Sequence, residues 1–160
     1  SQLRSFAQLS EKGSPPSFLF KNAGDIGQIN FIDLPNIDID ALRSEDIYAD
    51  KIKDQPWRFG KNIYVDYNFK NSGNWYYPGD GTRIWRLGIS SKDALTLNLT
   101  FNKYKLPPGA KLFIYSVDRS NILGAFTQQN NQDDGFFATS LLRGDSVIIE
   151  RQINSKYTKR

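Results

Sequence analysis

The sequence contains no cysteine and no histidine, and these two absences restrict the chemistry that the chain can perform. Without cysteine it forms no disulfide, no thiolate nucleophile and no zinc–thiolate site. Without histidine it lacks the commonest general base and a common metal ligand. A nucleophile–base pair would need lysine or a carboxylate as its base, and no motif marks such a pair. We therefore interpret the chain as a non-enzyme and expect no cofactor.

Methionine and long apolar runs are also absent. Because there is no methionine, we expect the chain to be a processed product or a fragment. No apolar run approaches the ~18 residues that cross a membrane, so we expect no membrane span. The lack of cysteine is compatible with a small secreted bacterial domain, although many cytosolic domains also lack it.

The charge is distributed unevenly along the chain. Residues 1–60 carry seven basic and nine acidic side chains, whereas residues 61–160 carry fourteen basic and eight acidic ones. Three of the basic residues, Lys156, Lys159 and Arg160, fall in the last five positions. Before them the basic residues are scattered among carboxylates without a dense cluster. This pattern favours a solvated surface with a basic tail over a nucleic-acid-binding protein.

The 160 residues predict one domain, and the 14% aromatic content favours β-structure. Alternating apolar residues and regularly spaced turns predict short strands. The expected strands cover residues 61–69, 82–90, 93–102, 111–116, 122–127, 136–142 and 146–153. Turn intervals of roughly 8–12 residues indicate an all-β fold, an antiparallel β-sandwich of the jelly-roll-like kind.

One short helix is expected within residues 36–53. Asp38 or Asp40 is suited to cap its N-terminus. Its inner stripe would be formed by four residues: Ala41, Leu42, Ile47 and Tyr48. The predicted organisation is an N-terminal arm (1–30), a helical segment packed on the sandwich (31–55), the β-sandwich (56–153) and a basic C-terminal tail (154–160). Within the arm, we expect the apolar triplet 18–20 to dock on the main body.

Trp75, Tyr76 and Tyr77 precede a Pro-Gly-Asp-Gly turn and form the main candidate for a ligand or partner surface. Exposed aromatic rings stack well on sugars and bind extended peptides. If the three rings form a sugar platform, they should be exposed and coplanar. The alternative interpretation is that they pack at the edge of the sandwich.

The loop 130–135 is rich in side-chain oxygens, which are the ligands that calcium prefers. An EF-hand-like spacing would need a glutamate at its twelfth position, where this chain has Leu141, so that motif fails. We expect a hairpin loop, with calcium bound through Asn130, Asp133 and Asp134 as the alternative.

Two carboxylates at a suitable separation could hydrolyse a glycosidic bond without histidine. The acids of the β region lie mostly at predicted turns, where they bond to nearby backbone. They are Asp66, Asp80, Asp93, Asp118, Asp133, Asp134 and Asp145. A stand-alone carboxylate hydrolase is therefore a third hypothesis, which requires two of these acids to face one cleft.

Several segments, taken in order, resemble a known family. They are residues 84–89 (IWRLGI), 94–99 (ALTLNL), 106–115 (LPPGAKLFIY), 123–127 (LGAFT), 131–139 (NQDDGFFAT) and 144–150 (GDSVIIE). The order resembles the N-terminal, non-catalytic region of secreted bacterial trypsin-like serine peptidases of the lysyl-endopeptidase-like group. The upstream residues 13–18 and 34–38 are similar to that region too.

The resemblance implies a propeptide or accessory domain of a secreted or periplasmic peptidase, assisting its folding or holding it inactive. The partner would be the protease domain in cis. No catalytic residue carries over, because the family's catalytic residues lie outside this chain. The alternative is a module that targets the parent enzyme to a glycan or protein ligand.

The basic tail fits this interpretation. A trypsin-like or lysine-specific enzyme cuts after residues such as Lys156, Lys159 and Arg160, and exposed chain ends are common sites of cleavage. These three residues are therefore the candidate processing site. The alternative is that Arg160 is only an arbitrary boundary.

Overall fold

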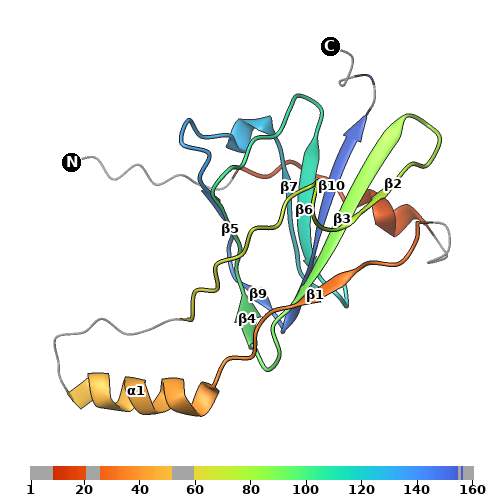
Figure 1. The fold of residues 1–160 in the computed structure, drawn as a ribbon. Helices are drawn as coiled ribbons and strands as arrows, with labels where there is room; N and C mark the ends of the chain where they lie inside the picture. The colour runs from red at the N-terminus through yellow and green to blue at the C-terminus, as the bar shows by residue number, and fades with distance from the viewer. Residues whose placement is uncertain (1–8, 21–25, 52–59, 155, 157–160) are drawn as a thin grey trace.

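The computed structural model describes residues 9–20, 26–51, 60–154 and 156, and in these residues the protein is β-rich with one α-helix (Figure 1). The helix α1 spans Ile39–Lys51. The strands are β1 (Phe31–Asp33), β2 (Asn74–Tyr76), β3 (Thr82–Ser90), β4 (Thr96–Leu97), β5 (Thr100–Phe101), β6 (Lys111–Ser116), β7 (Ile122–Phe126), β8 (Phe137–Ala138), β9 (Leu142–Arg143) and β10 (Ser146–Asn154).

The largest sheet has the strand order β1-β3-β10-β6-β7. β10 pairs with the whole of β3, so β1 and β2 both lie along the other edge of β3, one after the other. Two small sheets, β4 with β9 and β5 with β8, are separate from it. The long central strands β3 and β10 thus carry the side chains of both faces of the sheet.

Four of the predicted strands correspond closely to β3, β6, β7 and β10. The expected strands 93–102 and 136–142 are each interrupted, and only two-residue ladders remain of them. The expected strand 61–69 is not formed, since residues 61–68 have no regular secondary structure and pair with no strand among the described residues. The sheet is also not wholly antiparallel, since β1 runs parallel to β3.

The first face of the sheet is buried under the two small sheets. Alternate residues of a strand point to opposite faces, so Trp85, Leu87 and Ile89 of β3 lie on this face. They form one hydrophobic cluster with Val147 and Ile149 of β10. Side chains at or beside the small sheets complete it: Leu97, Leu99, Phe101, Tyr104, Phe137 and Leu142.

The second face is buried under the N-terminal arm. Phe18 packs edge-to-face on Tyr115, with 5.0 Å between ring centroids, and Phe20 packs in the same way on Tyr76. The backbone of Glu11 exchanges two hydrogen bonds with Ala125 of β7. Docking of the apolar triplet is therefore confirmed for Phe18 and Phe20, whereas Leu19 lies exposed.

Helix α1 begins as predicted but is not packed as predicted. Asp38 is the cap, because its Oδ1 accepts a hydrogen bond of 2.9 Å from the N–H of Ala41. The helix projects away from the sheets (Figure 1), and Ile47 and Tyr48 of the expected inner stripe are 62% and 68% exposed. The sheet faces are already covered by the arm and the small sheets, which leaves α1 without a core to bury these side chains.

No helix in the described part of the chain is long and apolar enough to cross a membrane.

Candidate functional site

The three predicted site residues Trp75, Tyr76 and Tyr77 do not share one face. Trp75 and Tyr77 lie on the same side, with centroids 6.4 Å apart and ring planes inclined by 20°. Tyr76 points to the opposite side, where Phe20 of the arm packs on it. The two-residue period of a strand separates them, so a platform of three coplanar rings is not formed.

Trp75 is half-buried in a cluster of aromatic rings. Its indole N–H donates a hydrogen bond of 3.3 Å to the carbonyl of Phe69, whose ring lies 6.2 Å away. The Phe69 ring also packs edge-to-face on buried Trp85 at 4.8 Å. Tyr77, in contrast, is 62% exposed. Within the predicted surface, Trp75 therefore packs at the edge of the sheet, whereas Tyr77 is exposed.

Two arginines that the sequence reasoning missed complete this surface. The guanidinium carbon of Arg151 lies 4.5 Å from the centroid of Phe69 and 5.9 Å from that of Trp75. The β3–β10 register pairs Arg151 with Trp85 and Arg83 with Ile153, which places both arginines on the first face of the sheet. We call these residues the arginine–aromatic patch: Phe69, Trp75, Tyr77, Arg83 and Arg151.

The two guanidinium groups of the patch lack counter-charges. In the described part of the chain neither forms an ion pair, and the Nε atoms of both are buried without a hydrogen-bond acceptor. Burial lowers the pKa of Arg151, and the positive charge of Arg83 lowers it further. The sequence does not set this pair apart, because each of the two strands also carries a second charged residue, Arg86 in 82–90 and Glu150 in 146–154.

The opposite face carries a second buried polar group, centred on Glu150. Its Oε2 accepts a hydrogen bond of 2.7 Å from the Tyr115 hydroxyl, and its Oε1 accepts one of 2.9 Å from the backbone N–H of Ser17. Arg86 stands opposite Glu150 in the register and donates to the carbonyls of Ile26 and Gly27. These contacts fix the arm and residues 26–27 to the sheet.

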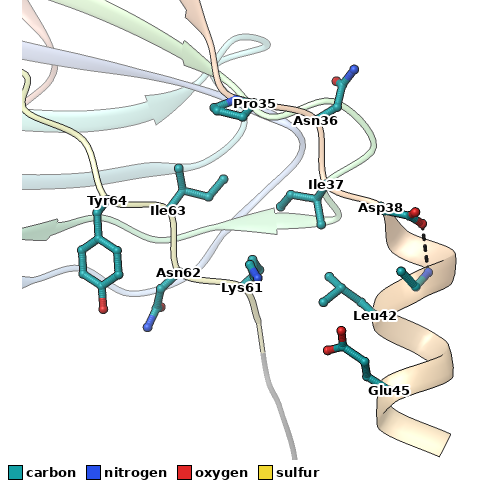
Figure 2. A pocket seen from close by; sticks show the side chains of 11 residues that line it. Pro35, Asn36, Ile37, Asp38, Leu42, Glu45, Lys61, Asn62, Ile63 and Tyr64 are labelled. Carbon is teal, nitrogen blue, oxygen red and sulfur yellow. Dashed lines mark hydrogen bonds between the residues drawn. The ribbon is translucent and has the colours of Figure 1, made fainter.

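A hollow of about 530 Å³ lies between α1 and the extended residues 61–64 (Figure 2). Leu42 and Glu45 extend from the helix towards Lys61 and Asn62 (Figure 2). The full lining is Pro35, Asn36, Ile37, Asp38, Ala41, Leu42, Glu45, Lys61, Asn62, Ile63 and Tyr64. Next to it, Tyr64 is 92% exposed, and Val65, Ile47 and Tyr48 are exposed as well. Exposed apolar side chains thus occur on both segments that border the hollow.

Asn130 is the first residue of the loop considered as a calcium site, and its side chain is hydrogen-bonded to two backbone groups. Its Oδ1 accepts a hydrogen bond from the N–H of Thr127, and its Nδ2 donates one to the carbonyl of Leu9. Asp134 accepts a hydrogen bond from the N–H of Phe136, and Asp133 lies exposed beside it. Among the described residues there is no group of three acids that could hold a metal ion.

The acids of other turns also bond to nearby groups. Asp80 accepts a hydrogen bond from the N–H of Thr82, which lowers the pKa of Asp80. Asp118 accepts hydrogen bonds from the hydroxyls of Ser116 and Ser120 and from the N–H of Ser120, which hold the pKa of Asp118 at about 2. These contacts match the turn role that the sequence predicts for them.

In the candidate processing site, only Lys156 lies among the described residues. Its backbone N–H donates a hydrogen bond of 3.0 Å to Oδ1 of Asn154, the last residue of β10. Lys159 and Arg160 lie outside the described residues.

Comparisons with known protein families and with solved structures found no match for this chain.

Proposed function

We propose that this chain is the propeptide or accessory domain of a secreted or periplasmic trypsin-like serine endopeptidase, and that it contacts the peptidase domain through helix α1. The ordered segments from residues 84 to 150 that resemble the N-terminal region of such peptidases support this proposal. In this role the chain assists folding of the peptidase or holds it inactive, and it contributes no catalytic residue.

The observation that carries the contact is the exposed apolar surface of α1 and the residues beside it. Ile47 and Tyr48 are exposed on the helix, and Tyr64 and Val65 are exposed on the segment across the hollow. Large apolar side chains that are exposed in one region of a protein favour an interaction site there. Tyrosine and isoleucine at the centre of a contact would be covered by the peptidase domain, with the acids of α1 at its rim.

The finer fold assignment is also part of the proposal. The first face of the six-stranded sheet packs against side chains of the two small sheets, which supports the two layers of a β-sandwich. We propose a sandwich of the jelly-roll-like kind, in which the arm covers the outer face of the larger sheet.

The test mixes this chain with the peptidase domain of the same full-length protein, expressed separately. Adding this chain in trans should raise the refolding yield of the peptidase domain or reduce its activity. Ile47→Glu together with Tyr48→Glu should raise the concentration needed for half the effect by about tenfold, because buried aromatic contacts dominate binding. The matched control is Leu19→Glu, which adds a carboxylate at an exposed leucine on the arm, 83% exposed.

Two results would contradict the proposal. One is a full-length protein in which no peptidase domain follows residue 160. The other is a peptidase domain that refolds and works equally well with and without the chain.

The second candidate function is a module that targets the parent enzyme to a glycan or protein. It is favoured by the exposed Tyr77 and its near-parallel neighbour Trp75. A glycan-array signal that Trp75→Ala abolishes would support this function, and an array without any bound glycan would argue against the glycan form of it.

A further inference from the structure

We propose that the arginine–aromatic patch binds an acidic segment of a partner protein, with the carboxylates of that segment set against Arg83 and Arg151. This inference goes beyond the proposed function and does not depend on it, because the patch and the surface of α1 share no residue.

The two arginines of the patch carry unbalanced positive charge. They lie on the same face of adjacent strands, and each repels the other. Both Nε–H groups are buried without an acceptor among the residues that the structure describes, and an unpaired buried donor costs free energy. A carboxylate placed against the outer nitrogens would offset the repulsion, since charged hydrogen bonds between guanidinium and carboxylate are among the strongest in proteins.

Arg151 and the aromatic rings beside it are already held in place. Arg151 is held over the ring of Phe69 and near that of Trp75 by cation–π contacts. Phe69 is in turn held by Trp85, and Trp75 by its hydrogen bond to Phe69. An ordered arginine loses less conformational entropy when it binds. Arginine, tryptophan and tyrosine are also the residues that dominate protein–protein contacts.

The shape of the patch suits a peptide better than a sugar. A sugar platform needs open aromatic faces, but Trp75 is half-buried and Tyr76 lies on the other side of β2. An extended peptide does not require open aromatic faces. Its carboxylates would reach the two arginines, and Tyr77 would cover its backbone. In the described part of the chain, the edge of β2 away from β3 pairs with no strand, so it offers free backbone groups to such a peptide.

The experiment measures binding of a fluorescein-labelled hexaglutamate peptide to the 160-residue chain by fluorescence anisotropy. We expect saturable binding that weakens as salt is added. Arg83→Gln and Arg151→Gln should each weaken it about tenfold or more. Arg119→Gln is the matched control, because Arg119 also lies over an aromatic ring, 4.4 Å from the centroid of Phe18, but on the opposite face and without a second arginine. This control should bind like the unmodified chain.

Further variants and probes distinguish the alternatives. Arg151→Lys keeps the charge and should retain part of the affinity, which separates lost charge from lost folding; thermal unfolding checks each variant. Arg83→Gln stands alone as the test if Arg151→Gln fails to fold. The peptide assignment is overturned if hexaglutamate does not bind, if Arg119→Gln weakens binding as much as Arg83→Gln does, or if hexaglutamine binds equally well. Tighter binding of an oligogalacturonate would replace the peptide with an acidic glycan.

Discussion

At the scale of single residues, Glu150 shows how a buried charge is accommodated. The side chain is 0% exposed, and each of its two oxygens accepts a hydrogen bond, one from Tyr115 and one from the backbone of Ser17. A buried carboxylate is tolerated only when its hydrogen bonds are made. Glu150 therefore connects the arm to the sheet, because Ser17 lies in the arm and Tyr115 lies in β6 of the sheet.

Glu150→Gln should destabilise the protein by about 2 kcal/mol or more, since the amide nitrogen cannot accept a hydrogen bond and one donor loses its partner. Urea unfolding measures the change. Glu11→Gln is the matched control, because Glu11 forms an exposed ion pair of 3.5 Å with Lys111. Such pairs contribute about 0–1 kcal/mol. Equal effects of the two substitutions would contradict the role assigned to Glu150.

At the scale of elements, the sequence predicts the strands that are buried on both faces and fails where pairing is short. Alternating apolar residues in β3 and the apolar run 147–149 in β10 reveal these strands directly. Residues 61–69 alternate as a strand does, yet alternation reports which side chains face inward and not whether a partner strand exists. β1 was missed because three residues carry almost no pattern, and its parallel pairing depends on β3, far along the chain.

Helix α1 is an element whose stability should be local. Asp38→Ala removes the cap and should cost the helix about 1 kcal/mol. Because α1 projects from the sheets, hydrogen exchange of its first turns should accelerate while the midpoint of global unfolding stays unchanged. Asp40→Ala is the control, since it removes a carboxylate from the same turn that makes only an exposed contact of 3.8 Å with Arg43. A fall in the global midpoint with Asp38→Ala would show that α1 is part of the cooperative core.

At the scale of the whole molecule, the central sheet brings together residues that the sequence keeps far apart. The tryptophan and tyrosines of the candidate surface were identified from their local cluster. Arg83 and Arg151 were not, because only the register between β3 and β10 makes them neighbours. In the sequence these two arginines do not differ from the other basic residues, which are scattered among carboxylates. The patch is therefore formed by residues from strands that lie far apart in the sequence.

The same sheet should give the protein a characteristic loss of stability in alkali. Tyr104 lies in the cluster of the first face and Tyr115 in that of the second, and burial raises the pKa of both. The charge of Glu150 raises the pKa of Tyr115 further. Above pH about 10 an unfolded tyrosine loses its proton while these two keep theirs. The folded state then binds more protons than the unfolded state, so its stability is complete below pH about 10 and declines as the pH rises beyond it.

Urea unfolding between about pH 8 and pH 11 measures this dependence. Tyr104→Phe and Tyr115→Phe each keep the ring but remove the ionisable hydroxyl, so each should flatten the decline above pH about 10, and the double variant should flatten it more than either. The absolute stability of Tyr115→Phe at pH 8 should be lower, because Glu150 loses a donor, but the slope is the quantity that reports the titration. A double variant that declines as steeply as the unmodified protein would show that groups other than these two tyrosines limit stability in alkali.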